Sequence, residues 1–137
     1  MIIRGRGIAP GVGTGDLVVS PAPISFLAGV DPGTGIIIEK GHPLFGQAIG
    51  GKVLAFPYGK GSTVGSYVLY ALSRSGHAPA AIINSEAEPI IATGAIMGRI
   101  PMIDRIGVPL KCLKNGTRAT VNGETGVLEY HGDLVHV

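Results

Sequence analysis

Short apolar runs separated by glycine and proline turns make up most of the chain, and one longer segment repeats its apolar residues at helical spacing. Val64, Val68 and Leu72 recur four residues apart, with further apolar residues between them. This pattern predicts a helix over Thr63–Ser75. Gly76 directly follows that segment and suits the left-handed residue that ends many helices.

The shorter apolar runs predict strands bounded by turn residues. These runs are Met1–Gly7, Asp16–Ser20, Ile36–Glu39, Lys52–Phe56, Ala80–Asn84, Pro101–Asp104, Thr117–Val121 and Gly126–Tyr130. Between them, Ala9–Gly15 is predicted to be a turn-rich connection, Ile24–Gly29 a single helical turn, and Glu88–Met97 a second, shorter helix. This order predicts an α/β protein with layers β/β/α, folded as a single domain over residues 1–137.

The composition indicates a partner. Only 15% of the 137 residues are charged and 45% are apolar, whereas about 25% of residues are charged in typical domains. The mean hydropathy is +0.40. A free monomer would therefore lack charged surface, and we expect another protein to cover part of it.

Charge and cysteine content exclude several classes of protein. The net charge is only +2, the basic residues are scattered and tryptophan is absent, so nucleic acid is not an expected partner. The single Cys112 cannot form an internal disulfide or hold a metal cluster alone, and the four histidines lack metal-ligand spacing. Arg4 and Arg6 interrupt the N-terminus, and no apolar run approaches about 18 residues. We expect no signal peptide, no membrane span and a cytoplasmic location.

The loop between Phe56 and the predicted helix is the main candidate for chemistry. It reads Tyr-Gly-Lys-Gly-Ser-Thr from Tyr58, so a glycine-flanked serine stands at a helix N-terminus. Unpaired N–H groups and the positive end of the helix dipole meet at such a point and favour a serine alkoxide. Ser62 is the predicted catalytic residue, with Lys60, Gly61 and Thr63 as substrate-binding residues. An ordinary N-cap role for Ser62 stays open.

A second candidate cluster follows the buried strand Ala80–Asn84. Sites in α/β folds tend to lie at the carboxyl ends of strands, so Asn84 and Glu86 are further predicted substrate-binding residues. In the alternative interpretation, Ser85 caps the next helix and the acidic residues simply favour its first turn.

Three segments give the chain a family resemblance: Leu27–Pro32, Gly41–Gly46 and above all Gly59–Tyr67. In order and spacing they resemble the small subunit of the aconitase X family, and the match extends through nearly the whole chain. The resemblance implies the swivelling β/β/α domain that aconitases carry as their mobile last domain. It also implies a hydro-lyase that is active only with a large subunit, as a heterodimer or larger complex.

Further expectations follow from the resemblance alone. The large subunit would hold a [4Fe-4S] cluster, whose iron draws off the substrate hydroxyl while Ser62 takes the proton. The substrate would be a small phosphorylated hydroxy acid, 5-phosphomevalonate, dehydrated to trans-anhydromevalonate 5-phosphate. One departure concerns the arginine that follows the serine in aconitase, because Thr63, Val64 and Gly65 stand here. Lys60 or the large subunit would have to supply that cation.

Two alternatives stay open. Within the family, a hydroxyproline-type dehydratase has a substrate without phosphate. Outside it, Gly76–Ile82 resembles the motif of phosphohistidine carrier domains, with His77 as the phosphorylated residue, although the hydroxyls that precede the histidine there are missing.

Overall fold

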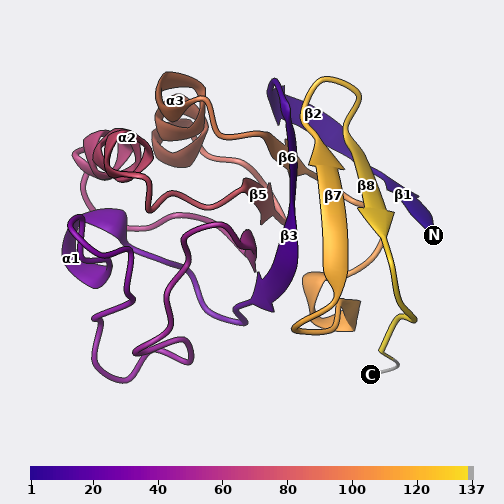
Figure 1. The fold of residues 1–137 in the computed structure, drawn as a ribbon, viewed down its shortest axis with the longest axis horizontal. Coiled ribbons are helices and arrows are strands. Elements are labelled where there is room, and N and C mark those ends of the chain that lie inside the picture. The colour runs from indigo at the N-terminus through magenta and orange to yellow at the C-terminus, as the bar shows by residue number, and fades with distance from the viewer. Residues whose placement is uncertain (136–137) are drawn as a thin grey trace.

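Eight strands form one sheet among residues 1–135, the part of the chain that the computed structural model describes (Figure 1). Their order is β1-β8-β7-β3-β4-β5-β6-β2. The strands are β1 (Ile2–Arg4), β2 (Arg6–Ala9), β3 (Val12–Val19), β4 (Val53–Phe56), β5 (Ala81–Asn84), β6 (Met102–Asp104), β7 (Arg118–Asn122) and β8 (Val127–Tyr130). The helices are α1 (Phe26–Gly29), α2 (Gly65–Ser75), α3 (Pro89–Gly98) and the 3₁₀ helix η1 (Leu110–Cys112).

Strand β3 joins two layers. Its first part, Val12–Asp16, pairs antiparallel with β7, and its last part, Leu17–Val19, pairs parallel with β4. One apolar core, which includes Leu17, Val53 and Tyr130, lies between the two β layers, and a second core lies between β4–β6 and the helices. Figure 1 shows α1, α2 and α3 together on one side of the sheet. The predicted β/β/α fold is confirmed.

Four parallel strands place their carboxyl ends at one edge. Strands β3, β4, β5 and β6 are mutually parallel, and α2 and α3 connect β4 to β5 and β5 to β6. The two helices touch closely because Gly94 faces Leu69; a Cβ at Gly94 would lie 2.7 Å from the Leu69 Cδ1. No helix within residues 1–135 combines the length and apolar character needed to cross a membrane.

The predicted first strand, Met1–Gly7, is wrong in its continuity. The strand is interrupted at Gly5, which separates β1 from β2. These two strands lie at opposite ends of the strand order. Gly5 donates its N–H to the Gly126 carbonyl at 2.8 Å, and a side chain there would collide with the Asp104 carbonyl. A glycine thus lets the chain pass from one edge of the sheet to the other.

The predicted turn over Ala9–Gly15 is also wrong, because β3 begins at Val12. Gly13 and Gly15 belong to the strand, where side chains would collide with the carbonyls of Ala80 and Gly51. The glycines therefore mark a close approach of two backbones and not a turn.

The predicted strand Ile36–Glu39 is replaced by isolated pairing. Ile36 makes one bridge with Ala48, and Ile37 makes another with Val30. The helix predictions hold better. Helix α2 begins at Gly65, two residues after the predicted start at Thr63. Helix α3 ends at Gly98, one residue beyond the predicted end at Met97. The predicted strand Asp16–Ser20 corresponds to β3 but misses its first four residues, whereas the predictions for β4 to β8 agree with the observed bounds within one residue.

Candidate active site

The serine loop, Tyr58–Thr63, leaves the sheet at Pro57 and lies between two supports. On one side it pairs with Ile24, whose N–H donates to the Tyr58 carbonyl at 3.3 Å and whose carbonyl accepts from Lys60 at 3.0 Å. On the other side Gly59 packs on α3, where a Cβ would come within 2.8 Å of the Glu88 Oε1. Only glycine lets the loop run this close to the helix.

Ser62 is exposed at the tip of this loop. Its Oγ accepts a hydrogen bond from the Val64 N–H at 3.1 Å. The N-cap position of α2 belongs to Val64, which makes no side-chain capping bond. Ser62 therefore lies two residues before the N-cap of α2 and is not itself the N-cap residue. Because Ser62 is exposed, its hydroxyl is accessible to a substrate.

The loop offers several donors around this hydroxyl. Among the described residues, no acceptor lies within hydrogen-bonding distance of the backbone N–H groups of Gly61, Ser62 and Thr63. Gly61 has φ +92°, and a Cβ there would approach the Ser25 Oγ to 2.8 Å. Free N–H groups at a loop–helix junction can stabilise an oxyanion.

Lys60 adds a positive charge to the same loop. Its Nζ donates to the Glu39 Oε2 at 3.2 Å, and both side chains are partly exposed. An exposed ion pair of this kind is weak, so an anionic ligand can compete with Glu39 for the ammonium group.

Asn84 lies at the base of the loop instead of at its surface. Its side chain is fully buried, and its Nδ2 donates to the Phe56 carbonyl at 3.0 Å. Its Oδ1 has no hydrogen-bond partner among the described residues. A direct contact between Asn84 and substrate stays a prediction.

Glu86 belongs to a charged cluster that we call the arginine corner: Arg6, Glu86, Asp104 and Arg105. Arg105 donates twice to Glu86, at 2.9 and 2.6 Å. This hydrogen bonding, with the nearby positive charges of Arg105 and Arg6, holds the pKa of Glu86 below its ordinary value. The same bonds raise the pKa of Arg105. Contact of Glu86 with substrate also stays a prediction.

Asp104 is the buried half of this corner and was not predicted. It is fully buried at the end of β6, where Arg6 donates to both carboxylate oxygens at 2.9 and 2.7 Å. The Ala87 N–H adds a third bond at 2.7 Å. The signal in the sequence was the lone charge that ends the buried run Met102-Ile103-Asp104.

The alternative interpretation, in which Ser85 caps the next helix, is wrong. Glu88 is the N-cap of α3, and its carboxylate accepts from the N–H groups of Ile90 and Ile91 at 2.8 and 2.7 Å. Two N–H groups near one carboxylate give a charge-assisted cap that the hydroxyl of Ser85 could not match.

The histidines within residues 1–135 do not form a cluster. His42 is buried in its loop, bonded to the Pro23 carbonyl and the Leu44 N–H, each at 3.0 Å. His77 follows the C-terminus of α2, at the opposite end of that helix from Ser62. His136 lies outside the described residues. Within residues 1–135, no three His, Cys, Asp or Glu side chains gather as a metal site would require.

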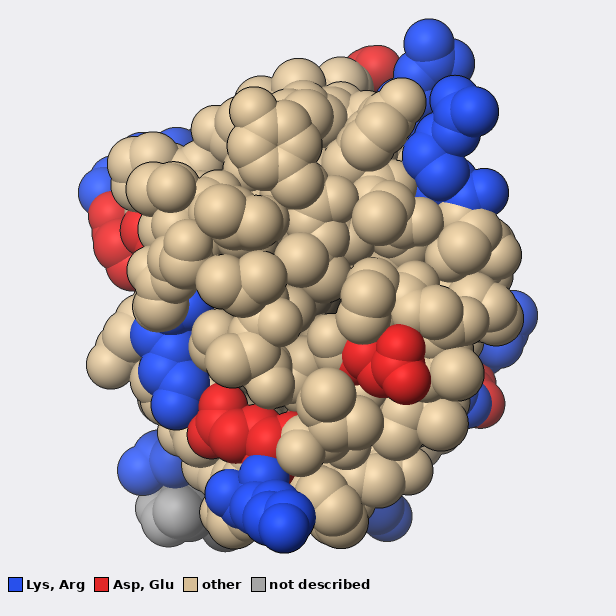
Figure 2. All heavy atoms as spheres, turned by 90° about the vertical axis from the view of Figure 1, so that its left-hand side faces the viewer, with Lys and Arg blue, Asp and Glu red and all other residues tan. Residues whose placement is uncertain are grey.

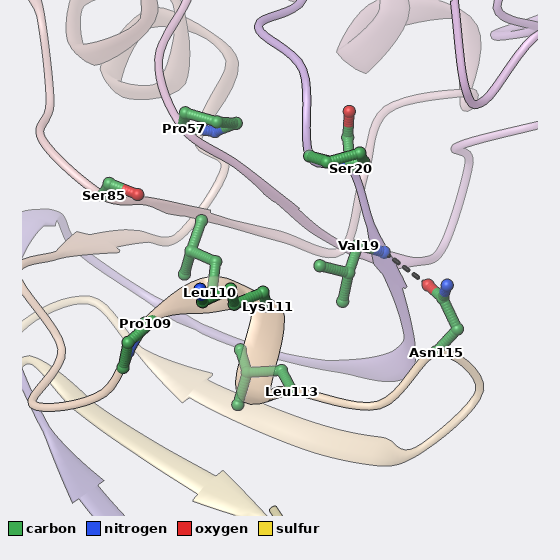
Figure 3. A pocket seen from close by; sticks show the side chains of 10 residues that line it. Val19, Ser20, Pro57, Ser85, Pro109, Leu110, Lys111, Leu113 and Asn115 are labelled. Atoms are coloured by element: carbon green, nitrogen blue, oxygen red, sulfur yellow. Dashed lines mark hydrogen bonds between the residues drawn. The ribbon is translucent and has the colours of Figure 1, made fainter. Parts of the chain in front are cut away.

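Two hollows lie near the carboxyl ends of the parallel strands. One, of about 330 Å³, lies beside Thr63 and is walled by the first turns of α2 and α3. The other, of about 460 Å³, lies between the end of β3 and η1 (Figure 3). Its lining includes Ser20, Pro57 and Ser85 but none of the predicted site residues. The hollow next to the serine loop is therefore the one adjacent to the candidate chemistry.

Comparison with known proteins agrees with this geometry. Residues 2–130 match the family model of the aconitase X swivel domain. The phosphomevalonate dehydratase small subunits of Methanocella arvoryzae and Pyrococcus furiosus are 55% and 53% identical, over 94% and 98% of this chain and 98% and 100% of theirs. A crystal structure of Thermococcus kodakaraensis aconitase X in its holo-form superposes with a TM-score of 0.89 at 46% identity, covering 99% of both chains. This chain belongs to the aconitase X swivel-domain family.

Proposed function

We propose that this chain is the small subunit of a hydro-lyase that converts 5-phosphomevalonate to trans-anhydromevalonate 5-phosphate. The observation that carries the proposal is an exposed serine whose neighbouring N–H groups have no partner in residues 1–135, in a chain that phosphomevalonate dehydratase small subunits match over 94% and 98% of its length. Those relatives favour a dehydratase over a phosphohistidine carrier. We further propose that residues 1–137 act as one swivelling unit.

Ser62 is the base of the proposed reaction. As an alkoxide, its Oγ takes a proton from the carbon next to the hydroxyl-bearing carbon. The C–H electron pair becomes the new double bond, and the hydroxyl leaves with its own bonding pair, so that the elements of water are lost. A serine alkoxide is a strong base that needs stabilisation, which the N–H groups of Gly61–Thr63 and the positive end of α2 provide.

Lys60, Gly61 and Thr63 bind the substrate in this proposal. The Lys60 ammonium takes the place of the aconitase arginine and exchanges Glu39 for an anionic group of the substrate. Thr63 lines the hollow beside the loop, and Gly61 keeps the backbone open to a ligand.

The residues of this chain do not fit an iron–sulfur cluster. Such a cluster needs several thiolates, whereas Cys112 is the single cysteine and stands on η1. We assign the cluster to the large subunit, together with the departure of the hydroxyl. The contribution of this chain is the base and its stabilising donors.

The large subunit would dock on the helical side of the molecule. Exposed apolar or aromatic side chains are carried there by α1, α2 and the segments that flank them: Leu27, Ile38, Phe45, Tyr58, Val64, Tyr67 and Tyr70. Figure 2 shows that side as a broad uncharged surface with charged groups mainly near its margins. Because this surface adjoins Ser62, docking there would enclose the serine and exclude water from it.

The test is turnover of 5-phosphomevalonate by the chain reconstituted anaerobically with its large subunit. Ser62→Ala should lower kcat about a thousandfold while the complex still forms. Ser75→Ala, which removes an exposed hydroxyl at the other end of α2, is the matched control. An unchanged rate with Ser62→Ala would exclude the serine as base. Absence of turnover by the wild-type complex would show that 5-phosphomevalonate is not the substrate. Dehydration of hydroxyproline would then be assayed next. Full activity of this chain alone would overturn the two-subunit proposal.

A further inference from the structure

We propose that Asn84 is a positioning residue for the serine loop: its buried amide fixes the carbonyl of Phe56, where the loop leaves the sheet, and so sets the position of Ser62. The inference rests on the proposed role of Ser62 as the base. It also assigns Asn84 a different role from the substrate contact expected from the sequence.

The base of the loop is held almost entirely by the segment that begins with Asn84. Strands β4 and β5 stay in register up to the pair Phe56 and Asn84. Beyond that pair, Pro57 has no N–H to continue the ladder. The Pro57 carbonyl accepts hydrogen bonds from the Ser85 and Glu86 N–H groups at 3.0 and 3.4 Å. The Asn84 Nδ2 donates to the carbonyl of the preceding residue, Phe56, at 3.0 Å. Two successive carbonyls are therefore fixed where the loop begins.

Stability alone does not explain an asparagine at this position. The side chain is fully buried, yet its Oδ1 has no partner among residues 1–135. A buried acceptor without a partner is unfavourable, and an apolar side chain of similar shape avoids that cost. A leucine would remove the unpaired oxygen, at the cost of the amide donor to the Phe56 carbonyl at 3.0 Å and of its longer contact with the Ile83 carbonyl at 3.4 Å. The amide is better explained by the direction that it gives to the loop.

Between this base and Ser62 the loop is also held at Tyr58 and Lys60, by hydrogen bonds with Ile24, and at Gly59, which packs on Glu88. These restraints end at Lys60, because the N–H groups of Gly61–Thr63 have no partner in the described chain. A shift at Phe56 can therefore reach the serine. A misplacement of about 1 Å is enough to lower a catalytic rate about a hundredfold.

The experiment compares Asn84→Leu, Ser62→Ala and the double variant in the reconstituted complex. Asn84→Leu should lower kcat between about tenfold and a hundredfold with little change in KM. In the Ser62→Ala background the same change should have almost no further effect, because the residue acts through the serine. Hydrogen exchange of the amides of residues 58–65 in the complex should become faster. Asn122→Leu is the control, since the Asn122 side chain bonds in the described residues only to the Glu124 and Thr125 N–H groups of the β7–β8 turn, at 3.0 and 3.1 Å.

Each outcome decides the question. Normal kcat and normal exchange in Asn84→Leu would overturn the proposal, as would losses that multiply in the double variant. If Ser62→Ala retains turnover, the proposed role of Ser62 as the base fails, while the exchange measurement still reports whether Asn84 orders the loop. If Asn84→Leu does not assemble with the large subunit, Asn84→Ala is judged by the same measurements.

Discussion

The serine loop and the arginine corner lie at the carboxyl ends of neighbouring parallel strands, the loop after β4 and the corner at β5 and β6. They differ in how far their polar groups are hydrogen-bonded. In the corner, the buried carboxylate of Asp104 receives three hydrogen bonds, and Glu86 is held by two more. In the loop, the exposed residues Gly61, Ser62 and Thr63 make no hydrogen bond through their N–H groups within residues 1–135, and the Ser62 hydroxyl has one internal bond. The polar groups of the corner therefore have their hydrogen-bond partners within the chain, whereas the donors of the loop are available to a ligand.

This contrast follows from the cost of burial. A carboxylate away from water must be paired, or the fold loses several kcal/mol, so Arg6 and Ala87 supply its partners. Exposed N–H groups bond to water at little cost and stay available for a negative charge that develops nearby. Unpaired donors at the surface therefore mark the candidate site, while saturated groups beneath the surface mark its support.

The largest effect on stability should come from the corner. Asp104→Asn removes the charge that Arg6 binds and places an amide against the Ala87 N–H. We expect the free energy of unfolding to fall by about 3 kcal/mol, measured by denaturant unfolding. The kcat of the folded complex should change less than about threefold, because Asp104 does not contact the loop.

Asp16→Asn is the matched control for this change. It breaks an exposed pair with Arg118 at 3.4 Å and should cost less than about 1 kcal/mol. Equal losses for the two variants would contradict the distinction between a buried and an exposed carboxylate. A large loss of kcat in Asp104→Asn would contradict the division between support and site.

The largest effect on activity without substitution of Ser62 should come from Gly59→Ala. The new Cβ would lie 2.7 Å from the Ile91 Cδ1 and 2.8 Å from the Glu88 Oε1, so the loop must move off α3. We expect kcat to fall about a hundredfold as Ser62 shifts. Gly107→Ala, where a Cβ meets nothing within 4 Å, should leave kcat unchanged. Normal turnover in Gly59→Ala would mean that the loop position is set elsewhere.

Much of this contrast was accessible from the sequence, and the exceptions have a common cause. The sequence Gly59–Thr63 predicted a loop with unpaired N–H groups before a helix, because local turn and helix signals are enough to identify such a loop. Asp104, by contrast, depends on Arg6, which lies 98 residues away along the chain. Gly13 read as a turn residue because its close neighbour, Ala80, also lies far from it along the chain. Local pattern predicts elements, whereas pairing across the sheet decides which polar groups are saturated.

A smaller effect should follow from removal of the loop cation. Lys60→Met should raise KM for the anionic substrate about tenfold with kcat nearly constant, since a partly exposed charge contributes mainly to binding. The difference from wild type should shrink at high salt. Lys40→Met, an exposed lysine outside the loop, is the control. A fall in kcat at constant KM would instead place the ammonium group in the transition state.

The smallest effect should come from Glu86, the exposed carboxylate of the corner. Its pKa is lowered from about 4.5 in the folded chain, first by the hydrogen bonds from Arg105. A lowered pKa means that the carboxylate stabilises the fold above its unfolded pKa, and that this stabilisation is lost as pH falls through the folded pKa. Glu86→Gln should therefore be slightly less stable than wild type at pH 7 and equally stable well below pH 4.5. Glu124→Gln, an exposed carboxylate without an ion pair in residues 1–135, reports the effect of net charge alone. A stability difference between Glu86→Gln and wild type that persists in acid would show that the carboxylate charge is not its source.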